Sequence, residues 1–169
     1  GTYIKRDYGT SIADFYTNIW WPDMIALAAK HNVKYTGVMI ENYEDDTDGE
    51  IQRQEDVQRF QYFGNMILHQ EGELGYHGYN HQPLSLPNTD YGDVLPYNTW
   101  TSLSAMEKAM KELMNFGKEM FPETEMSVYV PPSNVLSEEG RALLGSMYPQ
   151  IRTIASNYFS GEFAYVQEF

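Results

Sequence analysis

Hydrophobic and polar residues follow two periods along the chain, and the switches between them predict a series of strands and helices. Runs rich in β-branched and aromatic residues predict strands, whereas apolar residues three and four positions apart predict helices. Strands are expected over residues 2–7, 34–40, 73–76, 126–130, 151–155 and 163–166. Helices are expected over residues 22–31, 52–70, 104–120 and 138–147, and residues 10–20 form a loop or an irregular helix.

This alternation of strands and helices is typical of a mostly parallel sheet covered by helices. We predict an α/β fold, a distorted (β/α) barrel that is either closed or incomplete, in one domain over residues 1–169. The strands are too few for a complete barrel, so we expect the chain to be a fragment of a longer protein with other domains. Ligands of such folds bind where the strands end.

Local signals place the helix starts. Pro22 suits the first turn of a helix, and Ser104 with Glu107 matches a capping box. Ser137 is expected to cap the helix that follows it. A long loop with several prolines is expected over residues 82–100, a length that in compact domains is typical of a functional segment.

The amino-acid composition argues against several classes of binding partner and of structural site. The 169 residues contain 11 Lys and Arg but 24 Asp and Glu, for a net charge of -13. This charge argues against binding to nucleic acid or to an anionic membrane surface. There is no Cys, which excludes disulfides and thiolate metal sites, and no apolar run is long enough for a membrane span.

His77 and His81 form the main candidate site. They lie four residues apart, directly after the predicted strand 73–76 and among the glycines Gly75 and Gly78. Two neutral imidazoles that converge after a strand can bind a transition metal. The alternative is that they cap a helix or satisfy buried hydrogen bonds, but the spacing favours ligation. His31 and His69 precede strands, so they should lie at the opposite rim.

Two further segments follow predicted strands and should share the rim with the histidines. Asp7 would complete a His-His-carboxylate set, although a lone Asp after a strand is more often a turn residue. The other segment is the Pro131-Pro132-Ser133 turn. The acidic residues of 44–55 have calcium-loop spacing, but we interpret residues 41–50 as a solvated acidic loop.

Three stretches resemble the polysaccharide deacetylases, which are metal-dependent carbohydrate esterases on a distorted (β/α) barrel. The segment from Glu73 to Leu84 is similar to the family's histidine motif, and residues 22–40 to its first helix and second strand. The run from Val128 to Asn134 is similar to its groove motif. The resemblance implies a divalent metal, most often zinc, with cobalt or nickel as alternatives, on His77, His81 and Asp7.

The chain departs from the family pattern at several positions. The family's first motif has two adjacent acids, whereas Lys5-Arg6-Asp7-Tyr8-Gly9 has one, so Asp7 must serve as either the catalytic base or a metal ligand. The groove motif lacks its Arg, and no His follows His81 to act as the late general acid. These losses indicate either a missing part of the barrel or a divergent member of the family.

Three functions are compatible with these residues. The first is a hydrolase that removes N- or O-acetyl groups from a glycan, with Tyr76, Tyr79, Pro131, Pro132 and Ser133 at the substrate. The second is a catalytically degenerate barrel that binds carbohydrate or has a structural role. The third, a glycoside hydrolase, would need paired carboxylates, for which Asp7 and Glu41 are the candidates. Acetylated-glycan chemistry implies an extracytoplasmic or cell-envelope location.

Overall fold

The protein is an open α/β domain built on a small parallel sheet, described here from a computed structural model that covers residues 2–89 and 95–155. The four strands are β1 (Thr36–Met39), β2 (Glu73–Tyr76), β3 (Val128–Tyr129) and β4 (Thr153–Ile154). They lie in the order β1-β2-β3-β4, and each neighbouring pair is parallel. The predicted α/β fold with a mostly parallel sheet is confirmed, and the described sheet does not close into a barrel.

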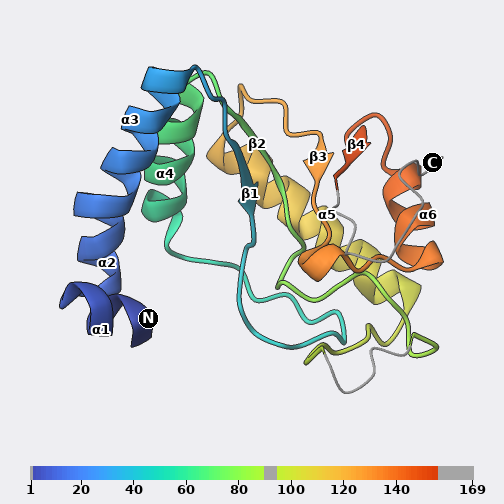
Figure 1. Ribbon diagram of the computed structural model, residues 1–169. Helices are drawn as coiled ribbons and strands as arrows, with labels where there is room; N and C mark the ends of the chain where they lie inside the picture. The colour runs from blue at the N-terminus through green and yellow to red at the C-terminus, as the bar shows by residue number, and fades with distance from the viewer. Residues whose placement is uncertain (1, 90–94, 156–169) are drawn as a thin grey trace, which may run out of the picture.

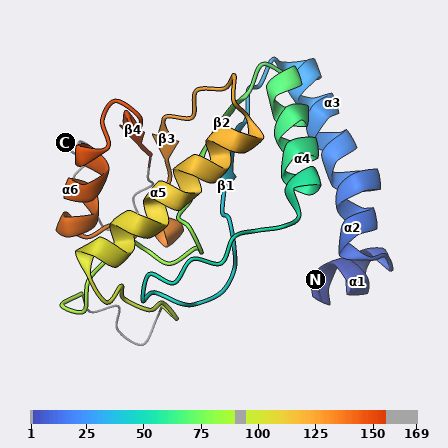
Figure 2. The same cartoon turned by 180° about the vertical axis from the view of Figure 1, so that it is seen from behind.

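Each pair of neighbouring strands is joined by a helix. The connecting helices are α4 (Val57–His69), α5 (Leu103–Met120) and α6 (Glu138–Ser146). The rear view shows α5 crossing over β2 and β3 (Figure 2). Within the described residues, no helix has the length and apolar content to cross a membrane.

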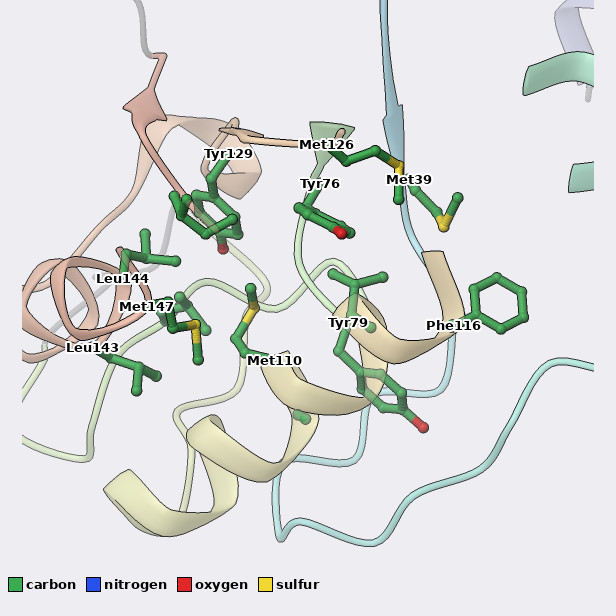
Figure 3. Close-up of a cluster of buried hydrophobic side chains, with 14 of the residues drawn as sticks. Met39, Tyr76, Tyr79, Met110, Phe116, Met126, Tyr129, Leu143, Leu144 and Met147 are labelled. Atoms are coloured by element: carbon green, nitrogen blue, oxygen red, sulfur yellow. The ribbon is translucent and has the colours of Figure 1, made fainter. Parts of the chain in front are cut away.

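Helix α5 supplies the centre of the core. Its residues Met106, Met110, Leu113 and Phe116 are fully buried, at the three- and four-residue spacing of one helix face. They pack with Tyr76 and Tyr129 from the sheet and with Leu143 and Leu144 from α6 (Figure 3). This packing accounts for the apolar face of α5, the longest helix among the described residues.

The amino-terminal segment is helical apart from the turn at residues 9–11, which makes the predicted strand at residues 2–7 wrong. It consists of α1 (Thr2–Tyr8), α2 (Ile12–Phe15), the π-helical turn η1 (Tyr16–Trp20) and α3 (Trp21–His31). In α1 the Arg6 guanidinium lies 4.9 Å from the Tyr3 ring, a contact that helical three-residue spacing permits. No described strand lies beside α1 to pair with it. The column that these helices form stands beside α4 (Figure 1).

The other boundaries agree with the predictions within a few residues, with two informative exceptions. Helix α4 begins at Val57 rather than at residue 52, because residues 51–56 have no regular secondary structure. Helix α5 is capped by Ser102, whose hydroxyl accepts the Ala105 N–H at 3.1 Å, rather than by the predicted Ser104. Ser137 caps α6 as expected, with its hydroxyl accepting the Gly140 N–H at 3.0 Å. The predicted strand 163–166 lies outside the described residues.

Candidate metal centre

His77 and His81 lie together where the chain leaves β2. The His77 N–H donates to the Met39 carbonyl at 2.8 Å, which continues the β1–β2 ladder one residue beyond the strand. Gly78 then turns the chain with φ 83°, and His81 itself has φ 63°. The two imidazole rings are 4.9 Å apart between centroids, at an interplanar angle of 63°. The predicted convergence of the two side chains is therefore present.

The residue that follows strand β3 determines which nitrogen of the His77 ring donates a hydrogen bond. Its Nδ1 lies 2.6 Å from the Val130 carbonyl oxygen. A carbonyl can only accept a hydrogen bond, so Nδ1 carries a hydrogen, and Nε2 is the nitrogen that presents a lone pair when the ring is neutral. A carbonyl or carboxylate partner on the second ring nitrogen is the usual arrangement of a metal-binding His. The hydrogen bond thus prepares Nε2 of His77 as a ligand.

His81 is kept neutral by its surroundings. Burial, and after it the charge of nearby His77, lower the pKa of His81. Both effects disfavour the imidazolium, so the ring is neutral around pH 7 and able to donate a lone pair. The Tyr97 ring packs beside it with centroids 5.8 Å apart. Two neutral imidazoles fit the donor set of a divalent transition metal.

The groove-motif turn does lie beside this pair. Pro131 and Pro132 follow β3 and are buried, and a Cβ on Gly78 would come 3.2 Å from Pro132 Cγ. Ser133 has φ 48° and is exposed, and its Oγ lies 2.5 Å from the Tyr97 hydroxyl. Tyr97 therefore connects Ser133 to His81, and the predicted proximity of the turn and the histidines is confirmed.

Gly75 is required for this approach of strands. A Cβ there would lie 2.5 Å from the carbonyl oxygen of Val128, a distance that side chains do not adopt. The absence of a side chain lets β3 come close to β2. That closeness in turn brings the Val130 carbonyl to His77, so Gly75 supports the site without touching it.

The structure does not bring Asp7 to the histidines. It lies on α1, exposed, with Oδ1 2.5 Å from Arg6 Nε and Oδ2 2.8 Å from Arg6 Nη2. The pKa of Asp7 is lowered, mainly by this hydrogen bond. Across residues 2–89 and 95–155, no set of three His, Asp or Glu side chains is grouped closely enough to hold a metal. The placement of Asp7 as third ligand or catalytic base is thereby corrected.

Tyr76 and Tyr79 are also misplaced by the prediction, because both are core residues. Tyr76 is 4% exposed and Tyr79 is 2% exposed, and both belong to the buried cluster around α5 (Figure 3). Burial raises the pKa of Tyr76 to about 12. In the described structure neither side chain lines a substrate groove.

Tyr79 and Asn80 have a role that the sequence did not reveal, since they hold the acidic loop. The Tyr79 hydroxyl donates to the Gln52 carbonyl at 2.9 Å and accepts the Gln52 N–H at 2.7 Å. Asn80 Nδ2 donates to the carbonyls of Glu44 and Asp46 at 2.8 and 2.7 Å. Within residues 77–81, His77 and His81 therefore form the candidate site, whereas Tyr79 and Asn80 bind the backbone of the preceding loop.

The acidic loop, residues 41–50, is held by polar contacts. Its described carboxylates do not form a group that could hold a metal ion. Gln82 Nε2 donates to Asp45 Oδ1 at 3.0 Å, and its Oε1 accepts the Asn98 N–H at 2.7 Å. Asp48 Oδ1 accepts the Glu50 N–H at 2.8 Å, a local turn contact. Amide side chains directly after a strand were the available sequence signal, because buried loop carbonyls need such donors.

Glu41 is the second residue beyond β1 and is fully buried. Burial first, and then the charge of Glu112, raise the pKa of Glu41 to about 7. Its charged neighbours are Glu112, Arg53 and Glu119, with no contribution from Asp7. The paired carboxylates of a glycoside hydrolase, Asp7 with Glu41, are therefore absent from the described residues.

The sequence was compared with family models and with curated proteins, and the structure with solved structures. The family model described as "Uncharacterised protein conserved in bacteria (DUF2194)" matches residues 1–168. A comparison with curated proteins found no match.

Similar solved structures include the wild-type BA3943 protein of Bacillus anthracis, described as a CE4 family pseudoenzyme, and two mutants of it. One mutant is described as having restored enzymatic activity. Each shares 18% identity with this chain at a TM-score of 0.54, over 80% of this chain. This chain spans 39% of the mutant chains and 37% of the wild-type chain. At this identity the likenesses show that the chain shares the fold of these structures.

Proposed function

The chain belongs to the bacterial family DUF2194, and from this premise we propose that it carries the histidine half of a deacetylase-type metal site. The proposed reaction is hydrolysis of N- or O-acetyl groups on a glycan. The observation that carries the proposal is the Nδ1 contact of His77 with the Val130 carbonyl, which leaves Nε2 free beside the His81 ring.

Each residue of the site has a defined part in this proposal. His77 and His81 would hold the metal, with zinc as the first choice and cobalt or nickel as alternatives. A divalent metal at such a site supplies a Lewis acid for a carbonyl oxygen and lowers the pKa of water. Val130 orients His77, and burial keeps His81 neutral.

The Pro131-Pro132-Ser133 turn provides a place for the acyl group. No described residue accepts a hydrogen bond from the Ser133 N–H, whereas the Asn134 and Val135 N–H groups bond to Pro131 and Pro132. A backbone N–H at a rigid turn is a typical donor to the oxyanion of acyl transfer. Ser133 is also exposed, so a sugar can reach it.

A second candidate function is a degenerate domain that binds metal or carbohydrate without turnover. The observation in its favour is that no described carboxylate joins the two histidines. The similar solved structures are described as pseudoenzymes, which fits this candidate as well as the first. Under this candidate the histidines keep their geometry but no acetate is released.

Zinc titration of metal-stripped protein by calorimetry tests the shared part of both candidates. One zinc per chain is expected, and His77→Ala or His81→Ala should weaken binding by about 100-fold. His69→Ala is the matched control, because this exposed His ends α4 at the opposite rim and should leave affinity unchanged. Equal zinc affinity in wild type and His77→Ala would contradict the proposed site.

Acetate release separates the two candidates. The natural full-length polypeptide, loaded with zinc, is incubated with chitin oligomers and with acetylated xylan. Release that is lost in His81→Ala supports the hydrolase. Zinc binding without acetate release from either probe supports the degenerate domain. Nitrogen NMR of the metal-free protein provides a separate readout, since His77 should show the tautomer protonated at Nδ1.

A further inference from the structure

Tyr97 is held against the histidine pair by the chain that directly follows His81. Its ring lies beside the His81 ring, with centroids 5.8 Å apart. The N–H of the next residue, Asn98, donates to Gln82 Oε1 at 2.7 Å. Trp100 is 1% exposed, and both its N–H groups donate to carbonyls a few residues beyond His81. These bonds fix the position of Tyr97 relative to His81.

Ser133 meets Tyr97 from the turn that follows β3. It lies three residues beyond Val130, whose carbonyl oxygen is 2.6 Å from His77 Nδ1. The Ser133 Oγ lies 2.5 Å from the Tyr97 hydroxyl. A hydrogen bond between two hydroxyl groups therefore joins the loop after β2 to the turn after β3, next to His81.

The backbone of Ser133 has a conformation that costs free energy. Ser133 has φ 48° and ψ 27°, and Asn134 follows it with φ 59°. The left-handed region is unfavourable for a residue with a side chain, because Cβ comes close to the following carbonyl oxygen. Such conformations persist where the surrounding structure imposes them, and they concentrate at functional sites. Here the conformation brings Ser133 Oγ to Tyr97, a contact that glycine would lose.

The chemistry of the two hydroxyl groups gives their hydrogen bond a direction. A phenol hydrogen is more acidic than an alcohol hydrogen, so the Tyr97 O–H donates to Ser133 Oγ. Ser133 keeps its own hydrogen for another acceptor. No other described residue bonds to Ser133 Oγ, and Ser133 is exposed. Donation from Tyr97 also strengthens the Ser133 O–H as a donor, because consecutive hydrogen bonds polarise one another.

We propose that Tyr97 is a positioning residue that directs the Ser133 O–H to the acyl oxygen of a ligand at the histidines. This role rests on the proposed function, because it requires an acetylated ligand beside a metal on His77 and His81. The acyl oxygen gains negative charge when water adds to the carbonyl carbon, and a fixed uncharged donor stabilises that charge. The Ser133 hydrogen stays on Oγ, so no proton is transferred. The pair needs a bound ligand but no turnover, and it therefore also suits the degenerate domain.

Binding of acetohydroxamic acid to the zinc-loaded, natural full-length polypeptide tests this role by calorimetry. The probe carries an acetyl group on a group that chelates zinc. Ser133→Ala and Tyr97→Phe should each weaken its binding by about 5- to 10-fold. The double variant should bind the probe no more weakly than Ser133→Ala, because Tyr97 acts only through Ser133. The matched control Tyr62→Phe, at an exposed tyrosine of α4, should bind as wild type does.

Urea unfolding and zinc titration show whether the two residues are structural instead. Tyr97→Phe and Ser133→Gly should keep the wild-type zinc affinity and should not lower the urea midpoint, since glycine relieves the left-handed backbone. Both should nevertheless weaken binding of the probe. A lower urea midpoint for Tyr97→Phe would indicate a structural role and would overturn the proposal.

The remaining outcomes separate this role of Tyr97 from the proposed function. Equal probe affinity in wild type and Tyr97→Phe, with zinc bound normally, would overturn the role of Tyr97 alone. Additive losses in the double variant would also overturn it, because Tyr97 would then act independently of Ser133. A zinc-loaded wild type that does not bind the probe has no place for an acyl group, which overturns it as well. Failure of the wild type to bind zinc would overturn the proposed function and the role of Tyr97 with it.

Discussion

Replacement of Glu41 by Gln is expected to remove most of one pH-dependent contribution to stability. The Glu41 side chain is fully buried, and neither carboxylate oxygen has a hydrogen-bond partner among the described residues. The pKa of Glu41 is raised from 4.5 to about 7, first by burial and then by Glu112. The Gln54 backbone N–H and the Arg53 guanidinium oppose this rise. In the folded protein the acid is therefore neutral over a range where the unfolded chain has it ionised.

The sign and size follow from proton linkage. A folded-state pKa above the unfolded one gives stability that is complete below pH 4.5 and is lost as the pH rises to about 7. At about 1.36 kcal/mol per pKa unit, the loss amounts to about 3 kcal/mol. The free energy of unfolding of Glu41→Gln should lack this loss, because a neutral amide does not titrate.

Urea unfolding followed by circular dichroism, from about pH 4.5 to pH 8, measures the effect. The difference in free energy of unfolding between Glu41→Gln and wild type should rise by about 3 kcal/mol across this range in favour of the variant. Comparing two proteins at each pH cancels all other titrating groups. The exposed Glu123→Gln variant should show no such rise. A constant difference between Glu41→Gln and wild type would refute the reasoning, since it would mean that Glu41 titrates alike in both states.

Three further predictions concern the site and its supports. Gly75→Ala should destabilise the protein by about 2–3 kcal/mol in urea unfolding, because the new Cβ would meet the Val128 carbonyl. The control Gly145→Ala should not destabilise the protein in this way, because the space around its Cβ is open. Asn80→Ala should lower stability by about 1–3 kcal/mol by leaving the Glu44 and Asp46 carbonyls without their donor, whereas exposed Asn88→Ala should change it little. His77→Ala should lower the stability of the metal-free protein by only about 1 kcal/mol, through loss of the bond to Val130; a loss of several kcal/mol would instead favour a structural histidine.

The fold class was predictable because local patterns and packing agree over most of the chain. Helix α5 has a strong three- and four-residue periodicity and is buried in the way that it implies. His31 and His69 end α3 and α4 ahead of β1 and β2, as expected for the rim opposite to His77. The strand predicted at residues 2–7 failed because a short alternating run needs a partner strand, and no described strand lies there.

The candidate site was predictable only in part. The spacing of His77 and His81 after β2 was sufficient to predict their convergence. Tyr76 was predictable as a core residue, since it lies two positions after buried Leu74 on the same side of the strand. Tyr79 was not, because Gly78 turns the backbone with a positive φ and breaks the strand alternation.

The network around Asn80 and Gln82 depends on long-range partners. Their acceptors lie more than 30 residues earlier in the chain, in the loop between β1 and α4. No local period encodes such contacts, and the loop composition alone indicated only a solvated acidic surface. The raised pKa of Glu41 has the same origin, since it depends on burial beside α5 rather than on sequence neighbours.

Strand β1 is an edge strand of the described sheet, and this position has a consequence for the solubility of the isolated chain. Unpaired strand edges are templates on which other copies can add, and the exposed Val38 side chain does not discourage this. The net charge of -13 opposes it, because like-charged copies repel one another. That repulsion acts over roughly 10 Å at 0.1 M salt but only about 3 Å at 1 M. The isolated chain should therefore stay dispersed in dilute buffer and aggregate through its sheet edge as salt rises or as its carboxylates become protonated.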